Sequence, residues 1–427
     1  MNKKIISIVG SGISGLVCAV KLSKSEFSKI YTIRVFESEE KIGGRVQSIK
    51  QDGFSIELGA GRISPSLHPN VCQLIDELKE KIEIFPFTDI AYPHPRHAGL
   101  KEKLAELKPL IDISLNESFF QFLSAHTSEV LAQEMINSLG YDTLHLPQIS
   151  PKIAYDIIEK HPEIQHFSDN ASNEWFNLVN GFSTITKHLY EEAIRSGVEF
   201  YFGHKLTNLH IQTTNSRLEF ENKAHQEVAQ HCAYAILALP PSAMSKIDID
   251  FPNSWSDFSY GSVPLFKGFL IFESPWWKDF GLENKVIIVD NPLRKIYFKG
   301  DTHVFFYTDS ANADFWHEVS QKEEDQYISV VMSLISKTLN VPVGQLPQPV
   351  NHEFKYWPNG VEFVLDESPA HPPVLSKNNG RVVSTSDAYT PHCGWMEGAI
   401  SAGRSAASHI LGSIEKSVMP ELVEELD

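Results

Sequence analysis

Residues 5–37 read IISIV-GSGISG-LVCAVKLSKSEFSK-IYTIRVFE, and this stretch decides the fold. Its first five residues are a short apolar, β-branched run, of the kind that forms a strand buried on both faces. A complete G-x-G-x-x-G follows, then a helical segment at 16–24 and a second apolar strand at 30–36 that ends on Glu37. Glu37 lies roughly 20 positions after the last glycine of the motif, the spacing of a dinucleotide-binding βαβ unit. The order of these parts predicts a Rossmann-like dinucleotide site.

Each part of this motif has a physical role in the predicted site. Gly10 permits the tight turn, Gly12 lets the backbone approach a pyrophosphate, and Gly15 lets the helix lie close to the strand. The helix N-terminus offers unpaired N–H groups and a partial positive charge to the phosphates, while Glu37 accepts hydrogen bonds from the ribose. The predicted cofactor contacts in this stretch are Gly10, Gly12, Ile13, Ser14, Gly15 and Glu37.

The charged start and apolar run of residues 1–9 also resemble a secretory signal. A cleaved signal would not need a second strand and an acid at the expected distance after the glycines. The complete order therefore favours a buried first strand.

Composition indicates a cytoplasmic globular protein of two or three domains, given 427 residues. An excess of 54 acidic over 37 basic side chains gives a net charge of −17, which repels phosphate backbones and acidic lipids and argues against nucleic acid as a partner. No run of 18 apolar residues is present, so no membrane span is predicted. The four cysteines form no CxxC pair, which fits reduced thiols, and the histidines lack metal-site spacing, so we predict no metal.

Two further segments identify the cofactor. KIGGR at 41–45 and GFSIELGAGR at 53–62 follow Glu37, and near the other end a strand at 381–387 precedes CGWMEGA at 393–399. A helix that continues through residue 410 begins there. The N-terminus of this helix would stabilise a negative charge placed beside it.

These segments resemble the FAD-binding amine oxidase family. The resemblance implies FAD as the cofactor, with Gly43 and Gly44 against it and Arg45 either on its phosphates or supporting that loop. Arg45 taken alone would be a solvated loop arginine. Asp387 stands where most of the family has Glu, so its side chain is one methylene shorter. The other contacts that the resemblance implies are Gly61, Arg62, Val198, Asp387, Trp395, Met396 and Gly398.

The remaining pattern predicts an α/β protein whose Rossmann-like FAD-binding domain is discontinuous. Helical periodicity runs through 100–141, is interrupted at Pro109, and has Asn116 and Ser128 as candidate N-caps. Strands are expected at 200–209, 232–240, 261–272 and within 285–307; the first two could also be simple core strands. The predicted divisions are an FAD-binding domain at 1–64, 182–240 and 378–412, a sheet-based substrate-binding domain at 241–377, a largely helical domain at 65–181 and an acidic tail at 413–427.

Lys267 is a candidate catalytic residue because it is a charge inside the apolar strand LFKGFLIF at 265–272. Its spacing to Trp277 resembles that of the family lysine that holds a water against flavin N5. Such a lysine could assist amine deprotonation or flavin reoxidation. The alternative is an edge-strand lysine that points to solvent.

Arg62 is a second candidate, since the small residues of 59–61 leave room beside the flavin. In amino-acid oxidases an arginine here binds the substrate carboxylate, and the guanidinium suits a carboxylate bidentately. A cationic polyamine substrate would gain nothing from it. The alternative is a purely structural arginine.

Resemblance to the L-tryptophan oxidases of violacein-type pathways extends over nearly the whole chain, including 57–65, 260–268, 290–301 and 386–398. It implies that Tyr307 hydrogen-bonds the substrate carboxylate beside Arg62 and acts with Arg62 and Lys267 in catalysis. It also implies that Tyr141 and His161 line the pocket and that Trp395 lies near the flavin and the indole. Tyr307 could equally be a core aromatic, and His161 could cap its helix.

The implied reaction converts L-tryptophan and oxygen to the imine of indole-3-pyruvate and hydrogen peroxide, with FAD carrying the hard chemistry. A downstream imine-coupling enzyme is the implied partner, and a homodimer is compatible with the sequence. Other interpretations stay open: a flavin amine oxidase or desaturase acting on a different substrate, an NADPH-dependent monooxygenase, and a non-catalytic flavoprotein. No second dinucleotide motif for a nicotinamide is present in the sequence.

Overall fold

A computed structural model describes residues 3–51, 53–84, 88–90, 99–111, 117–160, 175–250, 259–365 and 380–424. Its centre is a parallel five-stranded sheet in the order β19-β12-β1-β2-β8. The strands are β19 (Val382–Ser384), β12 (Tyr234–Leu237), β1 (Lys4–Val9), β2 (Tyr31–Phe36) and β8 (Glu199–Tyr201). Strands from both ends and the middle of the chain therefore build one sheet, which confirms the α/β class with a discontinuous Rossmann-like core.

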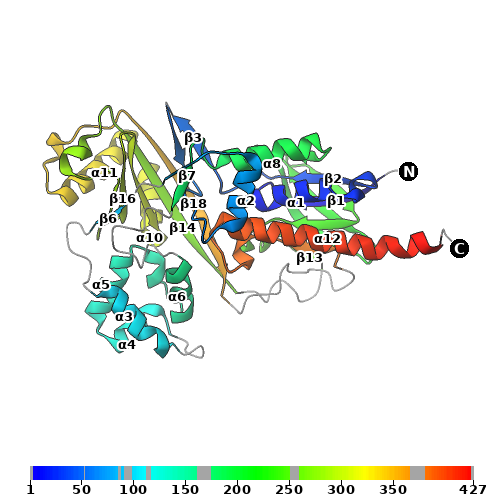
Figure 1. The fold of residues 1–427 in the computed structure, drawn as a ribbon, viewed down its shortest axis with the longest axis horizontal. Coiled ribbons are helices and arrows are strands. Elements are labelled where there is room, and N and C mark those ends of the chain that lie inside the picture. The colour runs from blue at the N-terminus through cyan, green and yellow to red at the C-terminus, as the bar shows by residue number, and fades with distance from the viewer. Residues whose placement is uncertain are drawn as a thin grey trace.

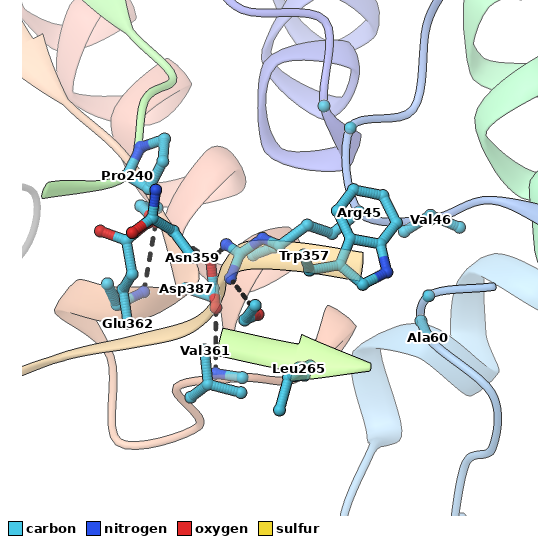
Figure 2. Close-up of a pocket in the computed structure, with 18 of the residues that line it drawn as sticks. Arg45, Val46, Ala60, Pro240, Leu265, Trp357, Asn359, Val361, Glu362 and Asp387 are labelled. Atoms are coloured by element: carbon cyan, nitrogen blue, oxygen red, sulfur yellow. Dashed lines mark hydrogen bonds and ion pairs between the residues drawn. The ribbon is translucent and has the colours of Figure 1, made fainter. Parts of the chain in front are cut away.

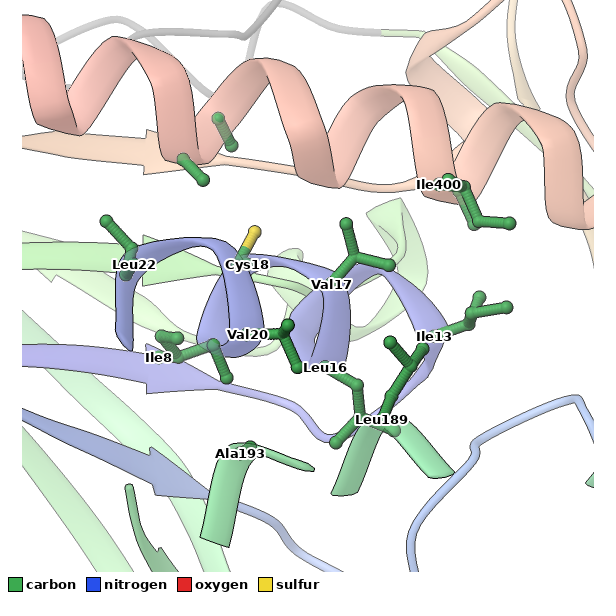
Figure 3. Packing of buried hydrophobic residues seen from close by; sticks show 14 of the residues in the cluster. Ile8, Ile13, Leu16, Val17, Cys18, Val20, Leu22, Leu189, Ala193 and Ile400 are labelled. Atoms are coloured by element: carbon green, nitrogen blue, oxygen red, sulfur yellow. The ribbon is translucent and has the colours of Figure 1, made fainter. Parts of the chain in front are cut away.

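The two faces of this sheet are covered differently (Figure 1). On one face lie α1 (Ile13–Ser23), α8 (Ser183–Arg195) and α12 (Met396–Glu424). Figure 3 shows Leu16 of α1 lying between Ile8 of the sheet and Leu189 of α8, while Cys18 and Val17 face α12. The other face packs on an antiparallel sheet whose strands are β11 (Glu227–Cys232), β10 (Ser216–Asn222) and β9 (His204–Ile211), joined at its edge by β13 (Asp248–Asp250).

A six-stranded sheet stands at the other end of the molecule (Figure 1), in the order β18-β14-β17-β16-β15-β6. Its strands are β18 (Asn351–Val364), β14 (Tyr260–Ile271), β17 (His303–Asp309), β16 (Lys295–Lys299), β15 (Lys285–Ile288) and β6 (Thr88–Ile90). Phe266 packs on the core beneath α10 (Ser310–Ser320) and α11 (Glu324–Leu339). Since side chains alternate along a strand, Lys267 faces the opposite side, toward the first sheet.

A helical group of α3 (Leu100–Leu107), α4 (Phe119–His126), α5 (Glu129–Leu139) and α6 (Pro151–Lys160) packs against Val263 and Phe363 of the large sheet. Ser128 caps α5 as expected, since its side chain accepts a hydrogen bond from the Leu131 amide at 3.2 Å. Ser118 caps α4 with a capping box, whereas Asn116 lies outside the described residues.

The remaining helices include α2 (Pro69–Leu78) and the short α9 (Pro241–Met244), and four short strands form two antiparallel pairs. They are β3 (Ser48–Gln51) with β4 (Phe54–Glu57), and β5 (Ile82–Ile84) with β7 (Phe176–Leu178). The predicted strand at 200–209 is two strands, because Gly203 turns the chain with φ +65° between β8 and β9. The helix predicted to continue through residue 410 runs to Glu424, and Ile414 is still fully buried in the first core.

Candidate functional site

A single cavity of about 1080 Å³ extends from the end of β1 to the face of the six-stranded sheet. This volume is above the usual range of about 300–1,000 Å³ for a small-molecule site. Gly12 at one end and Arg62 at the other both line it. The cavity therefore has room for a long cofactor together with a second, smaller molecule.

The glycine turn forms one end of the cavity. Gly10 has φ +100°, and a Cβ there would lie 2.4 Å from the Ala238 carbonyl oxygen, so no other residue fits. A Cβ on Gly15 would lie 2.0 Å from the Gly10 oxygen, which is the close approach that the motif predicts. At Gly12 a Cβ would meet nothing within 4 Å, and no side chain caps the helix that starts at Ile13. The free N–H groups of this helix N-terminus suit the phosphates of a dinucleotide.

Glu37 lines the same end of the cavity and also holds the turn. One carboxylate oxygen accepts hydrogen bonds from the Ser11 amide at 2.7 Å and the Ser11 hydroxyl at 2.8 Å. The other accepts from the Glu39 amide at 3.0 Å. Glu37 therefore stabilises the glycine turn through Ser11. The predicted contact of Glu37 with the ribose depends on this turn.

Arg45 joins the two flavin segments (Figure 2). Its guanidinium donates to a carboxylate oxygen of Asp387 at 2.5 Å and to the Gly360 carbonyl at 3.0 Å. The other oxygen of Asp387 accepts from the Gly394 amide at 2.9 Å. Of the two predicted roles of Arg45, these contacts match the support of the loop. Gly43 and Gly44, both with positive φ, place the backbone beside the cavity, and a Cβ on Gly44 would lie 3.4 Å from the Gly12 Cα.

Asp387→Ala is expected to weaken FAD binding by about tenfold, because it leaves the partly buried Arg45 without its anion and frees the loop at Gly394. FAD released on dialysis, measured by its fluorescence, gives the affinity. The control is Asp387→Glu, which restores the residue usual in the family and keeps the ion pair. Equal FAD release from the alanine variant and the unmodified protein would contradict this role.

The N-terminus of α12 closes the cofactor end of the cavity. Trp395 and Met396 line the cavity. Gly398 does not, because a Cβ there would lie 2.3 Å from the Thr390 hydroxyl oxygen, so it serves the close packing of the loop on the helix. Gly15 is also set back, and Val198 lies in the hydrophobic core rather than in the cavity wall.

Lys267 reaches across from the six-stranded sheet to the loop that follows β4. Its ammonium donates to the carbonyls of Gly59 at 2.6 Å and Glu57 at 3.1 Å. Gly61 makes room for it, since a Cβ there would lie 3.2 Å from Nζ. Burial lowers the pKa of Lys267, with the Glu57 carboxylate opposing and Arg62 adding to the shift. A lysine whose pKa lies below its ordinary value can exchange a proton more readily near neutral pH.

Arg62 and Tyr307 both line the cavity, as does Lys267. The Arg62 guanidinium lies 4.9 Å from the ring centre of Trp175, which sequence reasoning missed. Burial raises the pKa of Tyr307 well above its ordinary value, while the Arg62 charge acts in the opposite direction. Tyr307 therefore stays a hydroxyl donor beside a cation, which is a suitable pair for a carboxylate.

Aromatic rings form the walls around this pair. Tyr141 meets Tyr307 edge to face at 6.0 Å, and Trp175 stacks on Trp395 at 5.7 Å. We call the part of the cavity that contains Arg62 and Tyr307 the chamber. Its lining is otherwise mainly apolar and includes Leu144, Ile153, Ile157, Val263, Leu265, Val361 and Phe363. The predicted pocket residue His161 lies outside the described residues. The structure thus brings Arg62, Tyr307, Tyr141, Trp395 and Lys267 to one chamber.

Other residues of the site carried no sequence signal. Lys355 and Trp357 of β18 line the cavity, and the Trp357 indole donates to the Leu58 carbonyl at 2.8 Å. The side chains of this strand could be predicted to alternate between the two faces of a sheet. Which face Lys355 and Trp357 share depends on pairing with β14, which is far away in sequence. No group of three or more His, Cys, Asp or Glu that could hold a metal exists within the described parts of the chain.

His303 is a buried histidine in the wall of the cavity, 2% exposed and stacked on Phe54 at 5.2 Å. Burial, aided by the charge of Lys299, lowers its pKa from 6.5 to about 3. The unfolded chain therefore binds the proton more readily, so His303 contributes stability above pH 6.5 that is lost as the pH falls toward 3.

The loss of unfolding free energy from His303 should reach about 1.4 kcal/mol per pH unit in this window. His303→Gln, which keeps a polar side chain, should show a shallower fall in melting temperature between pH 7 and pH 5. Parallel melting curves for the two proteins over that range would show that His303 does not titrate as its burial predicts.

Comparisons with known proteins agree with this geometry. Residues 13–411 match the family described as flavin-containing amine oxidoreductase. An L-amino-acid oxidase of Sistrurus catenatus edwardsii is 21% identical over 341 residues, covering 70% of this chain and 63% of the relative. A 4,4'-diapophytoene desaturase of Staphylococcus haemolyticus is 26% identical over 130 residues, covering 28% of this chain and 25% of the relative. The chain thus spans less than two thirds of the length of these curated relatives.

Solved structures show the same fold over nearly the whole length. A putrescine oxidase triple mutant superposes with a TM-score of 0.73 and 15% identity, covering 96% of this chain and 99% of the other. Cyclohexylamine oxidase from Brevibacterium oxydans IH-35A gives a TM-score of 0.72, covering 97% of this chain and 100% of the other. No helix within the described ranges is long and apolar enough to cross a membrane.

Proposed function

Because the chain belongs to the flavin-containing amine oxidoreductase family, we propose that it is an L-amino-acid oxidase, with L-tryptophan as its substrate. FAD is the cofactor, and the fold is that of the amine oxidases. The observation that carries the amino-acid proposal is that Arg62 and Tyr307 line the same cavity, with Arg62 near enough for its charge to act on the Tyr307 hydroxyl. A guanidinium and a phenol bind a carboxylate well, and a plain amine substrate has none to offer.

The residues present fit FAD along the part of the cavity between the glycine turn and the N-terminus of α12. The open helix N-terminus at Gly12 and Ile13 would hold the pyrophosphate, with Glu37 near the ribose and Gly43 and Gly44 beside the cofactor. The N-terminus of α12 would face the flavin ring. When bound, FAD supplies the acceptor for the hydride of the substrate Cα–H.

The protein's own groups bind and orient the amino acid. Arg62 and Tyr307 would bind the carboxylate. Lys267 donates hydrogen bonds to the Glu57 and Gly59 carbonyls. It would transfer a proton or position a water beside the reacting amine. The apolar and aromatic chamber supports an apolar or aromatic side chain, and Trp395 and Tyr141 would flank an indole. His161 is proposed as a further wall of this pocket.

The assignment of tryptophan rests on the sequence resemblance to violacein-type L-tryptophan oxidases. It implies the imine of indole-3-pyruvate as product and a downstream imine-coupling enzyme as partner. We also propose a division into domains. Residues 1–64, 182–240 and 378–412 bind FAD, residues 241–377 bind the substrate, residues 65–181 form a largely helical domain, and residues 413–427 are the acidic tail.

Similarity to a desaturase keeps a second class of reaction open. Oxygen consumption and peroxide formation with L-tryptophan, measured with FAD and without NADPH, separate the two classes. An oxidase is expected to form one peroxide per oxygen consumed. No peroxide with any L-amino acid, or an absolute need for NADPH, would overturn the proposed function.

A further inference from the structure

Lys295 is a buried cation directly behind the proposed carboxylate site. It is 4% exposed and lies at the start of β16, where it pairs across the sheet with Tyr307. Tyr307 in turn pairs with Lys267, and Lys267 with Lys355. Directly opposed residues of antiparallel strands project from the same face, so Lys295, Tyr307, Lys267 and Lys355 form one row toward the cavity side.

The side chain of Lys295 contacts the two tyrosines of the chamber. Its ammonium nitrogen lies 3.2 Å from the ring centre of Tyr141 and 5.9 Å from that of Tyr307. Gly140 leaves the space that it needs, because a Cβ there would lie 2.7 Å from Lys295 Cε. A desolvated cation this close to a ring face is held firmly and holds the ring in return.

Charged groups from the adjoining elements surround this lysine. Asp309, 1% exposed at the end of β17, accepts from the Thr143 amide at 2.7 Å and hydroxyl at 2.9 Å. Burial and Asp142 raise the pKa of Asp309, and the charge of Lys295 opposes that rise. Asp142 is itself paired with the buried Arg294 at 2.8 Å.

These contacts connect the segment after α5 to the large sheet. Tyr141 and Thr143 come from that segment, while Lys295 and Asp309 come from β16 and β17. Lys295 is not in the cavity wall, so it would act through Tyr141 and Tyr307, which are. Its charge also makes a neighbouring phenol a better hydrogen-bond donor to an anion.

We propose that Lys295 is a positioning residue that sets the selectivity of the site for carboxylate-bearing amines. It holds the Tyr141 and Tyr307 rings in the part of the site to which Arg62 also contributes. This inference rests on the proposed amino-acid oxidase function.

The test compares Lys295→Met with Lys295→Arg, which keeps the charge. Flavin reduction without oxygen is followed with L-tryptophan and with its decarboxylated analogue, tryptamine, to give the dissociation constant and limiting rate for each. In Lys295→Met the dissociation constant of L-tryptophan should rise by about tenfold, the scale of a desolvated cation–π contact, while that of tryptamine changes little. Lys295→Arg should recover most of the loss.

If Lys295→Met loses affinity equally for L-tryptophan and tryptamine, or for neither, the selectivity role is overturned. Melting temperature and FAD content show whether the variant folds; if it does not, Lys295→Gln, which removes the charge but keeps a polar side chain, should lose the same preference for the carboxylate. In the unmodified protein, reduction by tryptamine but not by any L-amino acid would instead overturn the proposed function itself. The two failures are therefore distinguishable.

Discussion

Arg62→Ala is expected to raise the KM for L-tryptophan strongly, with a loss of roughly 2–5 kcal/mol in transition-state binding, the range for leaving one partner of a buried charge pair alone. The reason is that the substrate carboxylate would enter the chamber beside Tyr307 without the cation that lines it. Steady-state kinetics with saturating FAD give KM and kcat separately. Since the carboxylate keeps its charge throughout the step and would be bound in the ground state as well as the transition state, most of the effect should appear in KM.

A matched control is Arg62→Lys, which keeps the charge but loses the bidentate fork. The KM of Arg62→Lys for L-tryptophan should lie between that of the unmodified protein and that of Arg62→Ala. Arg62 also lies 4.9 Å from the ring centre of Trp175, so the melting temperature of each variant checks for structural damage. A KM for Arg62→Ala close to that of the unmodified protein would end the carboxylate assignment.

Lys267→Met is expected to slow one half-reaction by about 100-fold or more, the effect usual for a positioned proton-transfer group. Its ammonium is held by the Glu57 and Gly59 carbonyls, and its proposed role concerns a proton or a water and not the carboxylate. Substrate affinity should therefore change much less than rate. Stopped-flow measurements of reduction by L-tryptophan, and of reoxidation by oxygen, show which half-reaction depends on the lysine.

The direction in which the affected rate changes with pH shows which form of Lys267 is active. Burial lowers the pKa of Lys267 from its ordinary value of 10.5, so the lysine is charged below that lowered pKa and neutral above it. If the neutral amine accepts a proton, the affected rate rises with pH through this value; if the charge assists oxygen, the rate falls. Lys267→Met should remove that limb, and Lys267→Arg, which stays charged, should restore only a charge effect. Less than about threefold change in both half-reactions would exclude a proton-transfer role.

Local sequence was sufficient to predict the cofactor half of the fold. Gly10 and Gly15 sit where a Cβ would collide with backbone, so the motif reports a steric requirement that acts within one βαβ unit. The same is true of the Ser128 cap. The chain family, the fold class and FAD as cofactor are confirmed, whereas the individual roles of the site residues stay predictions.

Contacts made by distant pairing could not be predicted in this way. Lys295 and Lys355 resemble ordinary strand lysines until the order β18-β14-β17-β16 places them in one row with Lys267. Trp175 lies beside Arg62 through tertiary packing, with no local signal for the contact. Asp387 was recognisable as a departure from the family, but its bond to Arg45, far away in the sequence, needed the structure.

The most direct test of the central claim is stopped-flow flavin reduction without oxygen, comparing L-tryptophan, L-phenylalanine, L-leucine and a polyamine. Oxidation of an amino acid held by its carboxylate in an aromatic chamber predicts fast bleaching by L-tryptophan, slower bleaching by the other two amino acids and none by the polyamine. Bleaching by the polyamine alone would contradict the carboxylate role of Arg62. No bleaching by any of the four would point instead to a desaturase or a non-catalytic flavoprotein.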